Sequence, residues 1–145
     1  MTLRWQDIKS FNSSQNNAFE ELVCQLAREE SIEDRKEYHR VAAPDGGVEA
    51  YCVLENGDEY GWQAKYFSSM GTSQWRQLEE SFKTALRTHP KLAKYFICIP
   101  LDRQDPRREQ QAWFMDRWNE KTKAWADYAK SQGTRLWHFL CIQGE

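Results

Sequence analysis

Apolar residues recur at helical spacing in three segments of the chain. In residues 16–28 they fall three and four positions apart, behind a polar lead at 13–17 that can supply a helix cap. The same spacing predicts a second helix at about residues 73–88, which a proline follows, and a third near 109–131, which a glycine follows. Helices are therefore expected near the start, the middle and the end of the chain.

Between these helices the pattern changes to that of strands. Residues 48–54 are rich in aromatic and β-branched side chains, and the Asn56-Gly57 pair after them is a common hairpin signal, so residues 60–67 should return antiparallel. A short strand is expected to begin near Val41. "KYFICIP" has almost no polar break, as in a strand covered on both sides, and "TRLWHFLC" begins a last strand.

The order of the predicted elements is α, β, β, β, α, β, α, β. This order predicts an α/β fold with a mixed central sheet and helices on both of its faces. The 145 residues, 40% of them hydrophobic, fit one domain spanning 1–145. The sequence stops directly after the last predicted strand, so we expect it to be the N-terminal part of a longer multidomain protein. The polar N-terminus and the lack of any run of eighteen apolar residues predict a cytoplasmic protein without membrane contact.

Residue types that often bind metals or bases are interpreted mainly as structural. The four cysteines are far apart and each lies in an apolar segment, so we expect buried side chains rather than zinc ligands or disulfides. The three histidines are isolated in the sequence. Trp118 and Trp125 lie seven positions apart and are interpreted as core residues of the third helix, whereas a base-stacking role for Trp113 stays open.

The net charge of −2 gives no overall sign of nucleic-acid binding, so a surface that binds phosphate would have to be local. Lys91, Lys94, Arg107 and Arg108 lie near the ends of predicted elements and are the candidates for such a surface. A solvated charged face is the alternative interpretation of these four residues.

A polar face interrupts the strand predicted after the hairpin. Side chains alternate along a strand, so Gln63 and Lys65 share one face while their neighbours take the apolar one. The preceding strand brings Glu49 into the same sheet beside Gly46 and Gly47, which permit a close approach that a side chain would prevent. We expect a carboxylate, an amide oxygen and an ammonium group to converge there.

The first helix offers a fourth polar group. At about 100° per residue, Glu20 lies beside the apolar stripe and can face the sheet, whereas Glu21 points nearly opposite, toward water. The oxygen ligands of Glu49, Gln63 and Glu20 suit Mg²⁺ or Mn²⁺ rather than zinc. Lys65 would then orient or help deprotonate an attacking water, or neutralise charge on a phosphate.

Two structural interpretations of the same residues stay open. Lys65 is also what a surface lysine on an edge strand would look like, where it prevents edge-to-edge association. Alternatively, Glu49 and Lys65 form a buried ion pair with no catalytic role.

Three motifs in this order, "NAFEELVCQLA", "PDGGVEAY" and "GWQAKYF", resemble the PD-(D/E)xK nuclease superfamily, specifically the Mrr-like branch in which glutamine replaces the second acid. The resemblance covers roughly residues 16–100 and implies a restriction-endonuclease-like αβββαβ core, followed here by a C-terminal α-β extension. By position, Glu20 matches the helix acid of the family and Glu49 the sheet acid. Gln63 matches the second metal-ligand position and Lys65 the catalytic lysine.

The resemblance implies a magnesium-dependent endonuclease that hydrolyses the phosphodiester bonds of DNA, and double-stranded DNA is the expected substrate. It is nearest to nuclease effector domains of bacterial antiphage defence proteins, either CBASS effectors or STAND-type NTPases. A sensor, NTPase or ligand-binding region in the same full-length chain and a homo-oligomer in the active state are then expected. The alternative is a nuclease-like fold without catalysis that serves as a DNA-binding or protein-interaction module.

Overall fold

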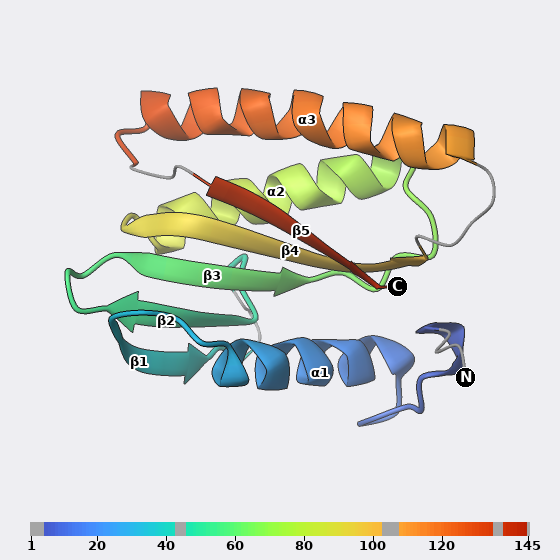
Figure 1. The fold of residues 1–145 in the computed structure, drawn as a ribbon, viewed down its shortest axis with the longest axis horizontal. Coiled ribbons are helices and arrows are strands. Elements are labelled where there is room, and N and C mark those ends of the chain that lie inside the picture. Colours follow the sequence, from blue (N-terminus) through green and yellow to red (C-terminus); the bar gives the residue numbers. More distant parts are fainter. Residues whose placement is uncertain (1–4, 43–45, 103–107, 135–137, 145) are drawn as a thin grey trace.

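Five strands of the described residues form one sheet, in the order β1-β2-β3-β4-β5 (Figure 1). The structure is a computed structural model that describes residues 5–42, 46–102, 108–134 and 138–144. At 101–102, 108–113 and 138–144 it describes the backbone only. The strands are β1 (Arg35–Arg40), β2 (Ala50–Leu54), β3 (Glu59–Ala64), β4 (Leu92–Asp102) and β5 (His138–Gly144). The helices are α1 (Gln15–Glu29), α2 (Thr72–Thr88) and α3 (Arg108–Ser131), preceded by a 3₁₀ turn at Trp5–Asp7.

The sheet changes direction at β3. The pairs β1–β2 and β2–β3 are antiparallel, whereas β3–β4 and β4–β5 are parallel. Parallel neighbours need crossover connections, and α2 and α3 provide them. The predicted α/β fold with a mixed sheet is therefore confirmed, including the C-terminal α-β extension.

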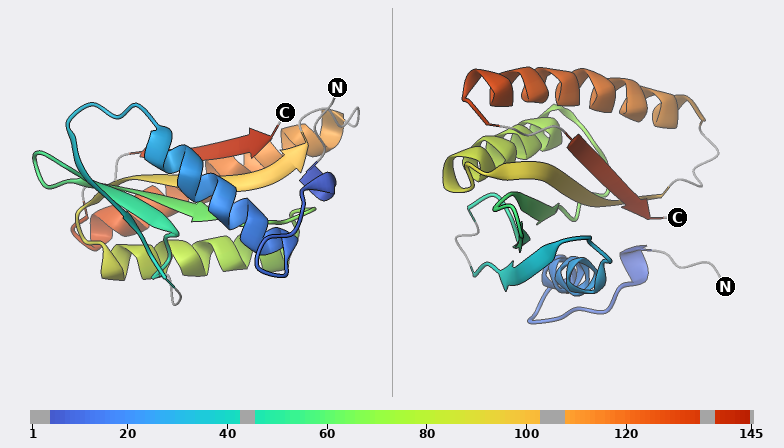
Figure 2. Two further views of the ribbon diagram at one scale, coloured as in Figure 1. Left: turned by 90° about the horizontal axis from the view of Figure 1, so that it is seen from below. Right: turned by 60° about the vertical axis from the view of Figure 1, so that its left-hand side comes forward.

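The helices cover both faces of the sheet. Figures 1 and 2 show α1 on one side and α2 with α3 on the other. The core between α1 and the sheet contains Phe19, Val23, Ala27, Cys52, Leu54, Trp62, Ala64 and Cys98. The larger core under α2 and α3 contains Leu78, Phe82, Leu92, Tyr95, Ile97, Trp118 and Trp125, among others. Since Trp62 and Ala64 face α1, the alternation along β3 places Gln63 on the face that α2 and α3 cover.

Helix α1 begins and ends where local hydrogen bonds satisfy its backbone. The hydroxyl of Ser14 accepts a hydrogen bond from the Asn17 backbone N–H at 2.9 Å, which makes Ser14 the N-cap that the polar lead predicted. At the other end, the Arg35 guanidinium donates to the carbonyls of Ala27 and Arg28 at 3.4 and 2.8 Å. The sequence therefore located this helix to within one residue at each end.

The strand expected near Val41 was placed too late. β1 ends at Arg40, and Val41 instead donates its backbone N–H to the Glu49 carbonyl just beyond the paired strands. β1 has the sequence RKEYHR, in which neither alternation nor an apolar run is visible, and its residues are all exposed or half-buried. Its position comes from pairing with β2, from Arg40 opposite Ala50 to Arg35 opposite Leu54.

The hairpin predicted at Asn56-Gly57 is confirmed. Leu54 and Asp58 close it with a backbone hydrogen bond of 2.8 Å, and Gly57 has the positive φ of 90° that such a turn requires. β2 and β3 are both shorter than expected. β3 ends at Ala64, so Lys65 lies one residue past the strand, and its backbone N–H still bonds to the Cys98 carbonyl of β4 at 3.0 Å.

The expected core residues of α3 and the expected buried cysteines are confirmed where the structure describes them. Trp118 and Trp125 are 6% and 1% exposed, and both belong to the core under α2 and α3. Cys24, Cys52 and Cys98 are buried. The side chains of Trp113 and Cys141 lie outside the described residues, so their predicted roles stay predictions.

Candidate active site

Glu49 and Gln63 face each other where β2 begins and β3 ends. Ala50 pairs with Trp62 in the antiparallel ladder, which makes Glu49 and Gln63 the next neighbours across the strands. Gln63 donates a hydrogen bond from Nε2 to Glu49 Oε1 at 2.8 Å. Gln63 is 1% exposed and Glu49 is 8% exposed. The two central residues of the predicted site are thus in direct contact inside the protein.

This pair differs from every other buried position that the structure describes. Within the described ranges, Glu49 and Gln63 are the only buried residues with a charged or amide side chain. Such groups are rarely buried in a core without a specific partner, because leaving water is unfavourable for them. Here each is the other's partner, through the hydrogen bond between them.

The Gln63 amide is only half satisfied. Its Nε2 donates to Glu49 and, at 3.2 Å, to the Ala64 carbonyl. Its Oε1 is buried and has no hydrogen-bond partner within the described structure. A buried acceptor in that state destabilises a protein by about 1–3 kcal/mol relative to a satisfied one. The amide oxygen therefore fits the role predicted from the sequence, as a ligand atom for a cation.

The pair lies where α/β sheets commonly bind ligands. β3 is the strand at which the sheet changes from antiparallel to parallel pairing, and Gln63 is the second-to-last residue of β3. In open α/β sheets, ligands bind outside the carboxyl ends of the parallel strands, at the point where the topology changes. The location of the pair is consistent with a ligand site on general structural grounds.

The turn that carries Glu49 is clamped from two sides. Gly47 has a φ of 87°, and a Cβ at this position would overlap the α2 backbone at Ser81 and Ala85. The Tyr95 hydroxyl of β4 donates a hydrogen bond to the Gly47 carbonyl at 2.7 Å. The predicted close approach at the two glycines is confirmed, and α2 is the element that approaches. These contacts fix the chain two residues before Glu49.

Sequence reasoning did not single out Tyr95. It lies inside the apolar run "KYFICIP", where an aromatic residue looks like any other core side chain. Tyr95 is fully buried and its ring packs on Phe82 of α2, so only its hydroxyl distinguishes it from a phenylalanine. A buried tyrosine hydroxyl needs a hydrogen-bond partner, and that requirement was the one available signal.

Lys65 is half-buried and lies just past the carboxyl end of β3. Alternation past the end of the strand puts its side chain on the Gln63 side of the sheet. Within the described residues, its ammonium takes part in neither an ion pair nor a side-chain hydrogen bond, including with Glu49. The ion-pair interpretation of Glu49 and Lys65 is thus not supported by the described residues.

Glu20 lies on the buried side of α1 but in a different layer from Gln63. Cys24, one helical turn after Glu20, contacts the Glu49 carbonyl through its thiol at 3.8 Å, so this side of α1 is turned toward the start of β2. Glu20 Oε1 accepts a hydrogen bond from Asn16 at 3.3 Å. α1 covers the face of the sheet opposite to Gln63. The structure therefore joins Glu49 and Gln63 directly, whereas Glu20 lies on α1, on the other side of the sheet from Gln63.

Glu21 lies on the outer side of α1, as expected, but it is paired there and only partly exposed. Its carboxylate accepts hydrogen bonds from Arg40 of β1 at 2.6 Å and from Gln25 at 2.9 Å, and its side chain is 22% exposed. The hydrogen bond from Arg40 is the main cause that lowers the pKa of Glu21. The helical angle of Glu21 was predicted correctly, but the edge strand β1 was not expected on that side of α1.

Of the basic residues suggested for phosphate binding, the two whose side chains are described, Lys91 and Lys94, lie away from the Glu49–Gln63 pair. Lys94 pairs with Tyr60 near the start of β3, and its ammonium lies 4.9 Å from the centre of the Tyr60 ring, on the α1 face. Lys91 is exposed just before β4, at the same end of the sheet. Arg107 lies outside the described residues and Arg108 opens α3 with its side chain left aside. Their role in DNA binding stays a prediction.

Two of the histidines have partners that the sequence did not indicate. His89 Nδ1 lies 3.2 Å from Glu59 Oε1, and the rings of His39 and His89 both pack on Tyr51, at 5.0 and 4.6 Å between centroids. Within the part of the chain that is described, no cluster of three or more histidine, cysteine, aspartate or glutamate residues could hold a metal ion. The predicted ligand set is of another kind, because it combines carboxylates with an amide oxygen.

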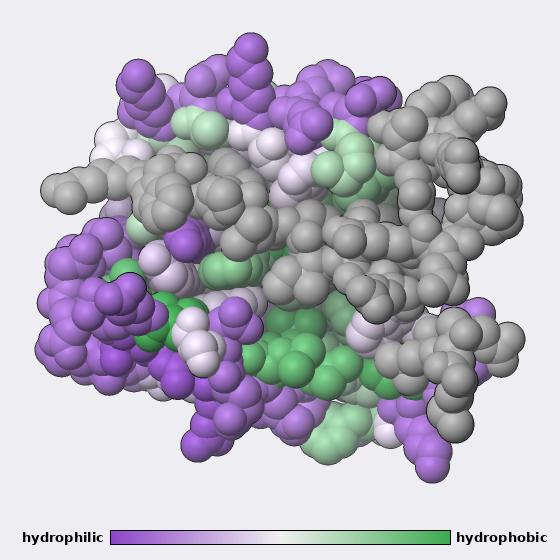
Figure 3. Space-filling model, viewed as in Figure 1, coloured by the Kyte–Doolittle hydropathy of each residue, from purple (hydrophilic) through white to green (hydrophobic). Residues whose placement is uncertain are grey.

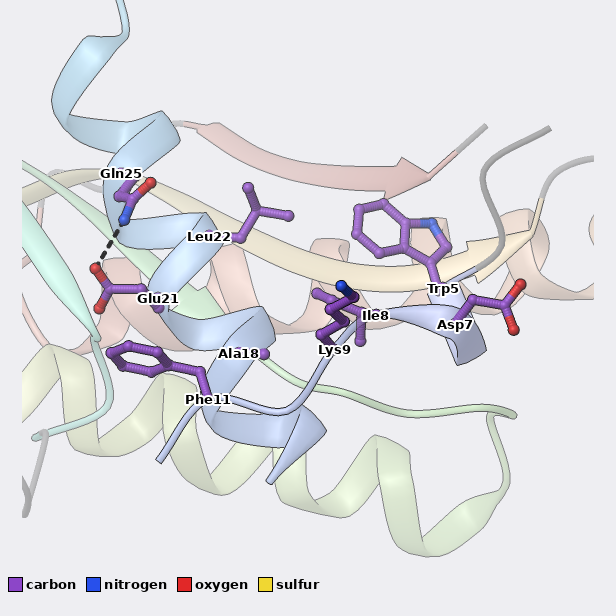
Figure 4. Close-up of a pocket in the computed structure, with 9 residues that line it drawn as sticks. All are labelled: Trp5, Asp7, Ile8, Lys9, Phe11, Ala18, Glu21, Leu22 and Gln25. Atoms are coloured by element: carbon purple, nitrogen blue, oxygen red, sulfur yellow. Dashed lines mark hydrogen bonds between the residues drawn. The ribbon is translucent and has the colours of Figure 1, made fainter. Parts of the chain in front are cut away.

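An open pocket of about 380 Å³ lies beside α1 rather than at the Glu49–Gln63 pair (Figure 4). It is lined by Trp5, Asp7, Ile8, Lys9, Phe11, Ala18, Glu21, Leu22 and Gln25. None of the predicted site residues belongs to it. The pocket and the buried polar pair are therefore separate features of the molecule.

No described helix combines the length and the apolar character needed to cross a membrane. Comparison with known proteins adds no further assignment, because no family model, no curated protein and no solved structure matches this chain.

Proposed function

We propose that the protein is a metal-dependent endonuclease that hydrolyses phosphodiester bonds of DNA at a site built on Glu49, Gln63 and Lys65. The observation that carries the proposal is the buried Glu49–Gln63 contact, in which Gln63 Oε1 has no partner within the described structure. A purely structural amide in a core would have both of its ends satisfied. The resemblance of the three sequence motifs to PD-(D/E)xK nucleases supports the same assignment.

The donor atoms fit a hard divalent cation. Glu49 offers a carboxylate and Gln63 an amide carbonyl, and both are oxygen ligands of the kind that Mg²⁺ and Mn²⁺ prefer. A bound cation of this kind polarises the phosphodiester and lowers the pKa of its bound water. The clamp on Gly47 holds Glu49 in place before any ligand arrives, so little reorganisation is needed.

Lys65 complements these oxygens with a positive charge. It follows Gln63 by two residues and lies on the same side of the sheet, at the carboxyl end of β3. Its Nζ would hold the charge that develops on the phosphate or orient the attacking water. Because Lys65 is half-buried, its ammonium is accessible to a substrate that comes from solvent.

The resemblance extends the proposal to biological context. An antiphage effector would be silent until a sensor region elsewhere in the full-length chain assembles several nuclease domains. The alternative is a nuclease-like fold without catalysis that binds DNA or another protein. The two functions share a fold. Only the nuclease cleaves DNA, and it would need Glu49 and Lys65 to do so.

The test is cleavage of supercoiled plasmid with Mg²⁺, with Mn²⁺ and without added metal, using high protein concentration and the full-length chain alongside residues 1–145. We expect metal-dependent nicking or linearisation that Glu49→Ala and Lys65→Ala both abolish. Glu55→Gln, at an exposed position in the hairpin turn, is the matched control and should cut like the unmodified protein. Cleavage at the unmodified rate by Lys65→Ala would end the assignment, and a full-length protein that never cuts would support the non-catalytic alternative.

Glu20 and Glu21 provide an internal comparison on one helix. If Glu20 contributes to the metal site, Glu20→Ala should raise the magnesium concentration needed for half-maximal cleavage while DNA binding changes little. Glu21→Ala removes the bond to Arg40 on the outside of α1 and should leave the metal dependence unchanged. An equal shift of the magnesium concentration in both variants would mean that the substitutions act by destabilising α1, and not by removing a metal ligand.

A further inference from the structure

The outer side of α1 carries an apolar strip that is distinct from its core-facing side. Ala18, Leu22 and Leu26 follow one another at intervals of four residues and so lie in one row along the helix, from buried Ala18 through half-buried Leu22 to Leu26. Leu26 is 59% exposed, and Phe11, in the segment before the helix, is 47% exposed. Of the large hydrophobic side chains that the structure describes, the only other one so exposed is Met115. Figure 3 shows this hydrophobic surface over α1 in the lower middle of the view.

The pocket beside α1 continues this strip. Leu22 and Ala18 of α1 line one side, and Trp5 and Ile8 of the N-terminal segment line the side opposite, while Phe11 lies beside Glu21 (Figure 4). In Figure 4 the Leu22 side chain points toward Trp5 across the open space. An apolar pocket that is open to solvent, next to a protruding leucine, is a common signature of a protein-binding surface.

A twofold axis between two copies of the chain would bring the exposed Leu26 of each copy to the pocket of the other. Leu26 and Ala18 are eight residues apart, which corresponds to about 12 Å along a helix. If two copies of α1 pack antiparallel and cross near Leu22, Leu26 of each copy lies against the pocket beside Ala18 of the other. The contact is then the same in both directions, as a closed dimer requires.

The charges at the two ends of α1 favour the same arrangement. Glu29 and Glu30 are exposed at the C-terminal end, where the helix dipole is unfavourable for acidic residues. Neither takes part in an ion pair with a residue that the structure describes. Lys9 is exposed at the rim of the pocket near the N-terminal end, and it too has no ion pair within the described ranges. Antiparallel packing brings Glu29 and Glu30 of one copy next to Lys9 and the N-terminal end of α1 of the other.

We propose that the outer side of α1, together with the pocket, is the surface through which two copies of this chain associate. The partner is a second copy because the same helix carries both the protruding Leu26 and the pocket. Antiparallel packing also places Glu29 and Glu30 of one copy near Lys9 of the other. The association is independent of the proposed hydrolysis and would hold for a non-catalytic protein as well. Where the protein does cut DNA, the dimer carries two copies of the Glu49–Gln63 pair in one particle.

The first test is sedimentation velocity from low to high micromolar protein. We expect the unmodified chain to move from its monomer mass of 17.3 kDa toward twice that mass as concentration rises. Leu26→Glu should raise the dimer dissociation constant at least about tenfold, because it buries an unpaired charge in the contact. Met115→Glu, at another exposed hydrophobic position, on α3, is the matched control and should not change the constant. Circular dichroism confirms that both variants are folded.

Exchanging the charges at the two ends of α1 distinguishes a specific contact from non-specific association. Lys9→Glu alone, and Glu29→Lys with Glu30→Lys alone, should each weaken the dimer, and the three changes together should restore it. A chain that stays monomeric at every concentration overturns the proposal. So does an equal effect of Met115→Glu, or failure of the combined exchange to restore association. Since mass is the readout, none of these results depends on whether the protein cleaves DNA.

Discussion

Replacing Gln63 by glutamate is the most informative single change, because it puts a second carboxylate against Glu49. The contact that Nε2 makes with Glu49 Oε1 at 2.8 Å would become a contact between two oxygens of like charge. Relaxed to about 4 Å, two unit charges repel by about 4 kcal/mol at the effective dielectric constant of about 20 that suits such sites. Gln63→Glu should therefore lower the free energy of unfolding by about 4 kcal/mol when both carboxyls are ionised.

The loss should depend on pH in a defined direction. Repulsion raises the pKa of the pair above the ordinary glutamate value of about 4.3, so the folded variant holds a proton that the unfolded chain releases. The destabilisation is therefore absent at low pH and grows as pH rises above about 4.3. At pH 5 the folded variant can avoid the repulsion by keeping one carboxyl protonated, which lowers the free energy of unfolding by only about 1 kcal/mol. At pH 8 both carboxyls are ionised, and the full repulsion of about 4 kcal/mol lowers the free energy of unfolding.

The assay is urea unfolding of the unmodified protein and of Gln63→Glu at pH 5 and pH 8, each without metal and with added magnesium. Gln25→Glu is the matched control, since Gln25 makes the same amide-to-carboxylate bond with Glu21 at 2.9 Å on the exposed side of α1. Repulsion between neighbours on an exposed helix is only about 0.2–0.5 kcal/mol. Magnesium should restore more stability to Gln63→Glu than to the unmodified protein, because an added acid strengthens an oxygen site.

Two results would refute this reasoning. Equal stability losses at pH 5 and pH 8 would show that Glu49 and the new carboxylate do not interact across the strands. A loss in Gln63→Glu no larger than in Gln25→Glu would show that the pair is open to water, which contradicts its burial. A pH-dependent loss that magnesium fails to relieve would confirm the contact and argue against the metal site.

Three further changes test the clamp and the outer side of α1 by thermal or urea unfolding. Gly47→Ala should destabilise by about 3 kcal/mol or more, because its methyl group overlaps the α2 backbone, whereas Gly133→Ala, also at positive φ but in open space, should lose about 1 kcal/mol. Tyr95→Phe should lose about 1 kcal/mol by removing its hydrogen bond to the Gly47 carbonyl, and a loss near zero would remove the hydroxyl from the clamp. Arg40→Ala should lose less than about 1 kcal/mol, because the pair with Glu21 is partly exposed. That small contribution is present above the ordinary pKa of 4.5 and disappears as pH falls below it, since Arg40 lowers the pKa of Glu21.

The helices and the hairpin could be predicted because their signals are local. α1 has a cap residue and an apolar stripe, and the Asn56-Gly57 turn requires a backbone conformation that few other residues adopt. The contact between Glu49 and Gln63 could be predicted as well, because strand alternation and one hairpin fix which side chains are opposite each other. For these features the sequence within about fifteen residues carries enough information.

Features that depend on distant pairing could not be predicted from the pattern. β1 is so charged that only its bonds to β2 make it a strand, and its position decides that Glu21 meets Arg40 instead of water. Tyr95 reaches Gly47 from 48 residues away, through a hydroxyl that no periodicity reveals. Long-range contacts of this kind determine the geometry of the candidate site. Short-range sequence patterns identify which residues belong to it but do not predict that geometry.

The three buried cysteines make the layer between α1 and the sheet accessible to chemical measurement. Cys24 lies on α1, and Cys52 and Cys98 belong to the sheet side of the same layer. Burial raises the pKa of the Cys24 and Cys52 thiols, so their reactive thiolate forms are rare while the layer is closed. An alkylating reagent should modify them only when α1 lifts from the sheet. Rates of alkylation at these positions would then report the opening of one layer of the protein, without any introduced label, while α2 and α3 stay in place on the other face.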